Sequence, residues 1–349
     1  TKAFEIKKAE STITLDGSLN KTYDGEKVNP NLEKTGSTNK LSVSYEQKKE
    51  DRWIQITEVP VNAGTYKLIA SVEADKNYNA ADASFEFTIA KKNNTWIENP
   101  SITGWTYGEE PHTPSAQAED GQPQFTYSRD EHGTYGELPE KADAGTWWMK
   151  TTVSASQNYN ELTDVRSFTI GKAASTIDIT SNLDKTYDEK PISDPIVTRT
   201  GSSAEVVYTW YQKKGNSYEQ INNAPVNAGE YKVVATLPSD TNYKEATAEK
   251  EFEIFKAPST IEITSNLDKE YDGKPVSNPT VDKSREDATV EFEWYLDNGD
   301  ESKKLATAPS DAGNYVVKTI LKEEANYQEA SDTKAFEIKK AESTITLDG

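Results

Sequence analysis

The chain has 349 residues, no cysteine and a formal net charge of −20, from 59 acidic and 39 basic side chains. This charge repels phosphate backbones and anionic lipid, and no apolar run approaches the roughly 20 residues of a membrane span, so we expect neither nucleic acid binding nor membrane insertion. The absence of cysteine excludes disulfides and thiolate chemistry.

The chain repeats itself. Residues 1–17 return unchanged as residues 333–349, and a turn led by tyrosine recurs at Tyr23, Tyr107, Tyr187 and Tyr271, at spacings of 84, 80 and 84 residues. Such a period predicts an array of small domains. We expect the last strand of a preceding repeat at 1–8, four repeats at 9–89, 90–171, 172–255 and 256–339, and the first strand of a following repeat at 340–349.

Strand patterns dominate every repeat, and the fourth shows them most clearly. Apolar and polar residues alternate in 259–264 and 288–296, and further strands are expected at 303–306, 314–321 and 333–339. Asn298 and Gly299 predict a tight hairpin, because both tolerate positive φ. Six or seven short strands with regular turns indicate an antiparallel sandwich.

Two recurring features favour an immunoglobulin-like sandwich, with a β-grasp-like repeat as the alternative. A bulky aromatic at Tyr45, Tyr127, Trp210 or Trp294 precedes by 20 or 21 residues the aromatic of an Ala-Gly corner, at Tyr66, Trp147, Tyr231 or Tyr315. In immunoglobulin folds a core aromatic packs beneath such a corner tyrosine, which lies two residues before a core position. That position is Leu68, Met149, Val233 or Val317 here.

The first repeat carries four motifs: Lys-Thr-Tyr-Asp-Gly at 21–25, Asn-Ala-Gly-Thr-Tyr at 62–66, Asn-Tyr-Asn at 77–79 and Phe-Thr-Ile-Ala-Lys at 87–91. They resemble the tandem MBG or "YDG" repeats of large bacterial, often Gram-positive, adhesin-like surface proteins. The resemblance implies an extracellular segment, attached to the cell wall through regions outside this sequence. The second repeat departs from the pattern at Trp105 and Trp147, which leaves its geometry open.

The resemblance implies a non-enzymatic stalk that projects a binding domain from the cell wall. Linkers of about five residues are too short for free tumbling, so we expect a monomeric rod of roughly 150 Å. The alternative is a directly adhesive array, in which each repeat binds host glycan or glycoprotein weakly and many act together. We expect no enzyme, because the only histidines, His112 and His132, lie in one repeat.

Trp148 is the one candidate ligand-binding residue. Strand alternation points Trp147 and Met149 inward and Trp148 outward, where the matching positions hold Lys67, Lys232 and Val316. An exposed tryptophan can stack on a sugar ring or anchor a protein. Alternatively, Trp148 covers a neighbouring strand or the adjoining repeat.

Two further groups of side chains bear on how the repeats are stabilised. Acidic and amide side chains gather at Asp16, Asn20 and Asp24, at Asn182, Asp184 and Asp188, and at Asn266, Asp268 and Asp272. They could hold calcium at domain junctions, but solvated turns are the preferred interpretation, and no cofactor is expected. Isopeptide cross-links, which the resemblance brings into view, would use Lys21, Lys185 and Lys269, but no buried catalytic carboxylate is evident.

Overall fold

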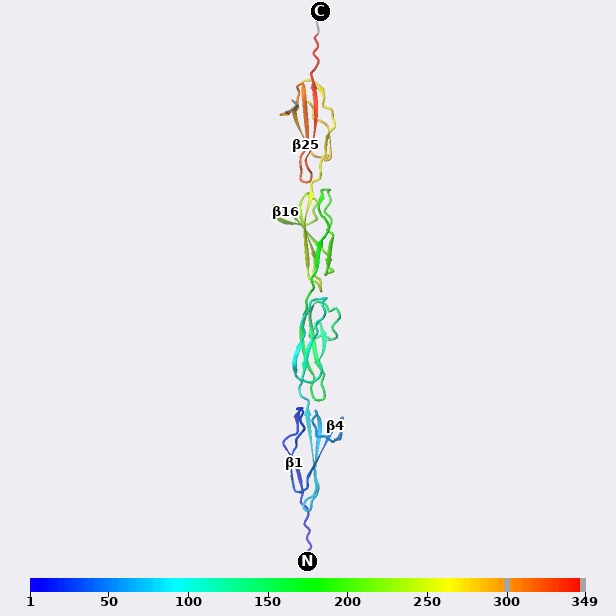
Figure 1. Cartoon of the computed structure of the whole chain (residues 1–349), viewed down its shortest axis with the longest axis vertical. Helices are drawn as coiled ribbons and strands as arrows, with labels where there is room; N and C mark the ends of the chain where they lie inside the picture. The colour runs from blue at the N-terminus through cyan, green and yellow to red at the C-terminus, as the bar shows by residue number, and fades with distance from the viewer. Residues whose placement is uncertain (298–301, 346–349) are drawn as a thin grey trace. The chain divides into compact units, whose positions relative to one another are not determined.

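The computed structural model describes residues 1–297 and 302–345. Throughout these residues the chain forms strands and turns, with no helix and hence none able to cross a bilayer. The chain divides into two compact units, Thr1–Ala173 and Ala174–Gly349. Each unit contains two small β-sandwiches, which correspond to repeats 1 and 2 and to repeats 3 and 4 (Figure 1).

Repeat 1 pairs a two-stranded sheet with a five-stranded one. The small sheet joins β1 and β3 antiparallel, and the large sheet has the order β2-β7-β6-β4-β5, antiparallel except where β2 runs parallel to β7. Ile13 of β1 and Leu68 of β6 meet in one buried core between the sheets. The strands are β1 Thr12–Asp16, β2 Lys21–Thr22, β3 Asn31–Thr35, β4 Leu41–Lys49, β5 Arg52–Ile56, β6 Gly64–Val72 and β7 Ala81–Ala90.

This connectivity is immunoglobulin-like. Strands β4, β5, β6 and β7 correspond to strands C, C′, F and G of an immunoglobulin sheet, and β1 and β3 form the opposing sheet. A β-grasp would need a helix packed on its sheet, and the described residues contain none. The prediction of an all-β, immunoglobulin-like sandwich is therefore confirmed.

Repeats 3 and 4 reproduce this topology strand for strand, with sheet orders β14-β19-β18-β16-β17 and β21-β26-β25-β23-β24. In repeat 3 the strands are β13 Thr176–Ile179, β14 Lys185–Thr186, β15 Val197–Thr200, β16 Val207–Lys214, β17 Ser217–Ile221, β18 Gly229–Leu237 and β19 Ala246–Phe255. In repeat 4 they are β20 Ile261–Ile263, β21 Lys269–Glu270, β22 Val281–Lys283, β23 Val290–Asp297, β24 Ser302–Leu305, β25 Gly313–Leu321 and β26 Ala330–Lys339.

The strands predicted for repeat 4 match β20, β23, β24, β25 and β26, with ends that differ by up to three residues. The sequence did not predict β21 and β22, which are two and three residues long. The hairpin predicted at Asn298 and Gly299 lies outside the described residues.

Repeat 2 keeps the arrangement with fewer regular strands. It contains β8 Trp96–Ser101, β9 Ser115–Ala118, β10 Gln124–Ser128, β11 Gly145–Val153 and β12 Leu162–Ile170. A parallel bridge from Thr106 to Gly171 takes the place of the pairing between β2 and β7. Trp105 is buried, stacks on Phe168 and lies against His112, which gives this histidine a packing contact.

The aromatic corner has the predicted geometry in all four repeats. The Tyr66 hydroxyl donates to the Asn62 carbonyl at 2.8 Å, four residues upstream, and Tyr231 and Tyr315 make the matching bonds to Asn227 and Asp311. In repeat 2 the indole Nε1 of Trp147 donates to the Asp143 carbonyl at 2.9 Å. The second repeat therefore retains the corner despite its different sequence. The core positions Leu68, Met149, Val233 and Val317 are fully buried.

Candidate functional site: the junction between repeats

The linker between repeats 1 and 2 is fixed by backbone hydrogen bonds. Strand β7 ends at Ala90, and two residues later the Lys92 N–H donates to the Asn158 carbonyl at 2.8 Å. The Asn160 N–H returns a bond to the Lys92 carbonyl at 2.9 Å. Only Lys91 therefore separates the last strand of repeat 1 from a residue that is bonded to repeat 2.

The side chain of Asn158 bridges the two repeats. Its Nδ2 donates to the Asn62 Oδ1 at 3.0 Å, and its Oδ1 accepts from the Ala63 N–H at 2.9 Å. A carboxamide can donate and accept at once, which neither a carboxylate nor an ammonium group can do. Asn158 thus recognises the Asn-Ala-Gly corner of repeat 1 through two complementary bonds.

An aromatic contact lies beside this amide. The ring of Tyr159 meets the ring of Tyr23 edge to face, with 5.7 Å between centroids and 70° between planes. Tyr23 is itself held by its N–H, which donates to the Ala90 carbonyl at the end of β7. The Asn-Tyr pair of repeat 2 therefore contacts both the corner and the tyrosine turn of repeat 1.

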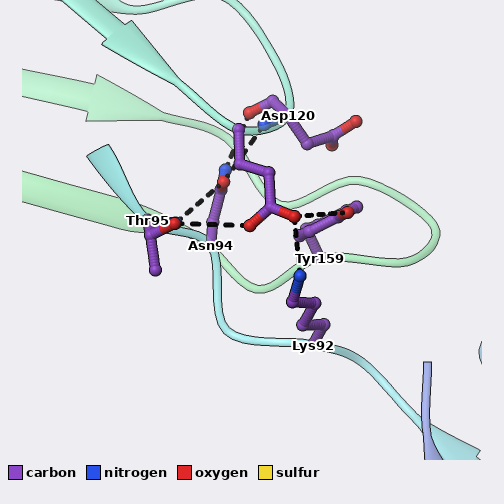
Figure 2. Close-up of polar contacts among 6 residues, drawn as sticks. Lys92, Asn94, Thr95, Asp120 and Tyr159 are labelled. Carbon is purple, nitrogen blue, oxygen red and sulfur yellow. Dashed lines mark hydrogen bonds and ion pairs between the residues drawn. The ribbon is translucent and has the colours of Figure 1, made fainter. Parts of the chain in front are cut away.

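A polar cluster in repeat 2 holds Tyr159 and the linker in place (Figure 2). The Lys92 Nζ lies 2.6 Å from the Glu119 Oε1, and the Tyr159 hydroxyl donates to the same oxygen at 3.3 Å. The hydrogen bond from Lys92 lowers the pKa of Glu119 and raises the pKa of Lys92, while burial and then Glu119 raise the pKa of Tyr159. Lys92 therefore stays charged and Tyr159 stays protonated at neutral pH.

Asn94 completes the cluster by joining the linker to the next turn. Its Nδ2 donates to the Asp120 carbonyl at 2.7 Å, and its Oδ1 accepts from the N–H groups of Thr95 and Asp120. The Thr95 hydroxyl donates to Glu119. Asn94 is buried, so its amide needs partners inside the protein, and these bonds supply them. Figure 2 shows the side chains converging beside the linker.

The junction between repeats 3 and 4 has the same design. Ala257 exchanges backbone hydrogen bonds with Asn326 and Gln328, each 2.9 Å long, two residues after β19 ends. The Asn326 Nδ2 donates to the Asn227 Oδ1 at 3.1 Å, and the Ala228 N–H donates to the Asn326 Oδ1 at 2.9 Å. The amide bridge thus occurs within both units.

The aromatic contact also recurs there, with an additional partner. Tyr327 meets Tyr187 edge to face at 5.5 Å, and its hydroxyl donates to the Glu189 Oε1 of repeat 3 at 3.4 Å. The guanidinium of Arg285 lies 5.2 Å from the Tyr327 ring centroid. Burial, followed by the charge of Glu189, raises the pKa of Tyr327, so its hydroxyl remains a donor at neutral pH.

A carboxylate shapes the Asn-Tyr loop in repeat 1. The Asp75 Oδ1 accepts from the N–H groups of Asn77 and Tyr78, both at 2.9 Å, and its Oδ2 accepts from the Thr38 N–H at 2.8 Å. These bonds, that of Thr38 first, lower the pKa of Asp75 to about 2. Asp240 accepts the equivalent bonds in repeat 3.

The structure places Trp148 on β11, half-buried, and buries Trp147 and Met149 on the opposite face, as strand alternation predicted. Its cross-strand neighbours are Ser128 and Ser167, both small. A ligand role for Trp148 stays a prediction.

The acidic and amide groups considered for calcium largely bond to nearby N–H groups. Asn20 accepts from the Thr88 N–H, Asp184 from the Glu253 N–H and Asp268 from the Glu337 N–H. Within the described ranges there is no group of three or more His, Asp or Glu side chains arranged to hold a metal. These bonds join the turns to the last strand of each repeat, and the absence of calcium stays a prediction.

The lysines considered for cross-links make ion pairs within the tyrosine turn. Lys21, Lys185 and Lys269 lie 2.5 to 2.6 Å from Asp24, Asp188 and Asp272, whose side chains are half exposed. The same lysines donate to the carbonyls of Glu26, Lys190 and Lys274. Each pair closes the turn without a buried carboxylate beside it.

The sequence did not predict that the Asn-Tyr pair joins repeats. The pair was visible as a recurring landmark, at Asn77, Asn158, Asn242 and Asn326, each followed by tyrosine. The only signal in the sequence was that this polar-aromatic pair recurs at the same place in every repeat, although it belongs to no apolar pattern. It marks a position that the repeat needs, but it does not show which residues the position contacts.

Comparison with known proteins agrees with the repeat organisation. The sequence profile of the MBG domain matches residues 11–93, 175–258 and 260–342. No curated protein sequence shows significant similarity to the chain.

Two solved structures are similar in part. The Drosophila N-cadherin EC1-4 structure is 13% identical, with 88% of this chain and 94% of that chain covered, at a TM-score of 0.25. The Sidekick-1 immunoglobulin domains 1-5 are 12% identical, with 96% and 78% covered, at a TM-score of 0.26. Scores this low carry no argument, so the fold assignment depends on the strand pairing described above.

MBG repeats are non-catalytic structural domains, and tandem copies of them suggest the repeat region of an extracellular surface protein. Three profile matches span more than half of the sequence, and the unmatched second repeat retains the same corner and the order of the three central strands. The chain belongs to the MBG domain family.

Proposed function

We propose that this chain is a spacer segment of an extracellular bacterial surface protein, which holds a binding domain away from the cell wall. The observation that carries the proposal is the fixed linker at Lys92, with its equivalent at Ala257. A spacer needs joints that resist folding back, and a linker with one unbonded residue between two sandwiches has little freedom.

The amide bridge adds to this restraint. Bending at the junction would break the two bonds of Asn158 and separate Tyr159 from Tyr23. Each hydrogen bond contributes about 1 kcal/mol and the aromatic pair about 0.5 to 1.5 kcal/mol, which is enough to bias a tethered joint strongly. The joint therefore favours one arrangement of the two neighbouring repeats.

Small-angle scattering tests the spacer proposal. If the chain is a spacer, its maximum dimension should approach the sum of four sandwiches of roughly 35 to 40 Å each. A double-length chain should then double that dimension. A compact particle, or a dimension that fails to grow with repeat number, would rule the spacer out.

A directly adhesive role is the second candidate, favoured by Trp148. This half-buried ring has the small residues Ser128 and Ser167 as its cross-strand neighbours, and a tryptophan ring can stack on a sugar. Titration of the whole chain with host glycans tests it, with Trp148→Ala as the variant and Val316→Ala, at the matching position of repeat 4, as the control. Binding that Trp148→Ala abolishes and Val316→Ala retains supports adhesion, whereas no binding by the native chain ends the idea.

A further inference from the structure

The residues that join repeats also occur at the two outer repeats. The Asn-Tyr loop of repeat 1 contains Asn77 and Tyr78, and the corner of repeat 4 contains Asp311 and Ala312, with Tyr271 beside it in the tyrosine turn. We propose that these are two docking surfaces, each of which takes another repeat of this type as its partner. The loop of repeat 1 fits a corner, and the corner of repeat 4 fits a loop.

Exposure separates the outer surfaces from the joined ones. Asn158 and Asn326, which bridge repeats, are half-buried, whereas Asn77 is exposed and its side chain has no hydrogen-bond partner among the described residues. The backbone of Asn77 is already fixed by Asp75 and by the Ala9 N–H. The loop is therefore formed, and only its side chain lacks the contacts that the other two make.

The corner of repeat 4 shows the same contrast. Tyr271 is 44% exposed, while Tyr23 and Tyr187, which meet a tyrosine from the next repeat, are only partly exposed. Ala312 is exposed, while Ala63 and Ala228, which donate to an asparagine, are half-buried.

The chemistry of this corner suits an asparagine. Asp311 replaces the Asn62 and Asn227 of the two observed junctions, and a carboxylate oxygen accepts from an asparagine Nδ2 in a charge-assisted bond. The Ala312 N–H would donate to the Oδ1 of the same asparagine, as the Ala63 N–H does. An aspartate at the asparagine position of the partner's Asn-Tyr loop would instead place its carboxylate against that of Asp311.

The geometry makes the pairing directional. The corner precedes β6 and the Asn-Tyr loop follows it, so nine strand residues, about 30 Å, separate the two surfaces of repeat 1. The loop surface of one repeat therefore joins the corner surface of its neighbour. Such a head-to-tail contact leaves one surface free at each end, so further repeats can be added.

The spacing of the linker is also shared. Ala9 bonds to Asn77 and Asn79, as Lys92 bonds to Asn158 and Asn160. Ala341 occupies the position of Ala9 in the repeated segment and lies two residues after β26, which ends at Lys339. A fusion of two copies through their shared 17 residues would therefore place a repeat-1 loop next to a repeat-4 corner without foreign sequence.

Electron paramagnetic distance measurements on this fusion test the proposal. The chain has no cysteine, so spin labels can be placed at Ala306→Cys of the first copy and Ser42→Cys of the second, the positions that match Thr57 and Gln124. Labels at Thr57→Cys and Gln124→Cys report on the observed junction of repeats 1 and 2 as the reference. We expect a distance distribution at the new junction as narrow as the reference.

Two variants of the fusion probe the recognition itself. Asn77→Asp in the second copy should broaden the distribution, because it removes the Nδ2 donor and faces Asp311. Adding Asp311→Asn in the first copy should restore the narrow distribution, since the donor then comes from the corner. A broad distance distribution in the fusion that keeps Asn77, or an unchanged distribution in the Asn77→Asp fusion, would overturn the proposal. It would also be overturned if the fusion with both Asn77→Asp and Asp311→Asn failed to regain the narrow distribution.

Discussion

Trp147 donates its indole N–H to the carbonyl of Asp143 at 2.9 Å, in the position where the Tyr66 hydroxyl donates to Asn62 at 2.8 Å. Two different side chains therefore make the same bond across four residues at the start of strands β11 and β6. Both rings are buried, so each polar ring group needs an acceptor, which the corner carbonyl supplies.

The corner bond should contribute measurably to stability. We expect Tyr66→Phe to lower the free energy of unfolding of repeat 1 by about 1 to 2 kcal/mol, because it leaves the Asn62 carbonyl without its donor. Native-state hydrogen exchange at the amides of β6 measures this locally, which avoids treating four repeats as one transition.

Tyr45→Phe is the matched control for this prediction. Tyr45 lies in the same core, across from Leu68, and no hydrogen bond to its hydroxyl is present among the described residues. Its replacement should change the stability by less than about 0.5 kcal/mol. Equal effects of the two substitutions would mean that the corner bond adds nothing specific.

The core and corner could be predicted from sequence because their signals are local. Tyr66 and Leu68 alternate along one strand, and the Gly64 that precedes them marks the turn. The short strand β21 carried no such signal: Lys269 and Glu270 are polar, and parallel pairing with β26 defines the strand. A two-residue edge strand is defined by its pairing with the neighbouring strand, and its own residues carry no strand pattern.

The junction could be predicted even less from the sequence. Asn158 and its partner Asn62 are 96 residues apart, so no local periodicity connects them. Recurrence identified Asn158 as a fixed feature, but only the arrangement of two folded repeats brings it to the corner. The replacement of tyrosine by Trp147 likewise hid a retained hydrogen bond, since the sequence does not show which atom donates.

Glu189 should strain the backbone of repeat 3. Its φ is 65°, in the left-handed region, where Gly25 and Gly273 have 81° and 74° at the matching positions. We expect Glu189→Gly to stabilise repeat 3 by about 1 kcal/mol, as measured by local hydrogen exchange, because glycine adopts this conformation freely.

The reverse substitution tests the same effect in repeat 4. A Cβ at Gly273 would meet no atom within 4 Å, so Gly273→Glu acts through the backbone alone and should destabilise repeat 4 by about 1 kcal/mol. If neither substitution changes stability, the left-handed conformation is not a strain. If both substitutions destabilise, the strain is real and the bond from Tyr327 to Glu189 outweighs it in repeat 3.

The Asn-Tyr loop of repeat 1 should be sensitive to acid. Folding lowers the pKa of Asp75 to about 2, below its ordinary value near 4, so its contribution to stability is present above about pH 4 and is lost as the pH falls toward 2. In a pH titration by NMR, the amide signals of Asn77 and Tyr78 should shift with a midpoint near pH 2.

Asp75→Asn should remove this acid transition and weaken the loop at neutral pH. The NH2 group of the new carboxamide is a donor, and it would face another donor, the N–H of Thr38 or of Asn77, so one hydrogen bond would be lost. Asp51→Asn, at an exposed turn, serves as the control and should leave the titration unchanged. A midpoint near pH 4 in the native chain would show that the backbone bonds to Asp75 are weak.

The second repeat contains a hydroxyl that its core does not satisfy. The Thr151 Oγ1 is fully buried and has no hydrogen-bond partner in the described structure, whereas Ala70 and Ala235 occupy the matching positions of repeats 1 and 3. We expect Thr151→Val to raise the stability of repeat 2 by about 1 to 2 kcal/mol, because valine keeps the shape and removes the unpaired polar group.

Thr319 is the matched control in repeat 4. It is equally buried, but its hydroxyl donates to the Asp332 carbonyl at 3.4 Å, so Thr319→Val should bring a smaller gain or a loss. Hydrogen exchange at the amides of β11 and β25 measures both, and a larger gain at Thr319 than at Thr151 would contradict this account.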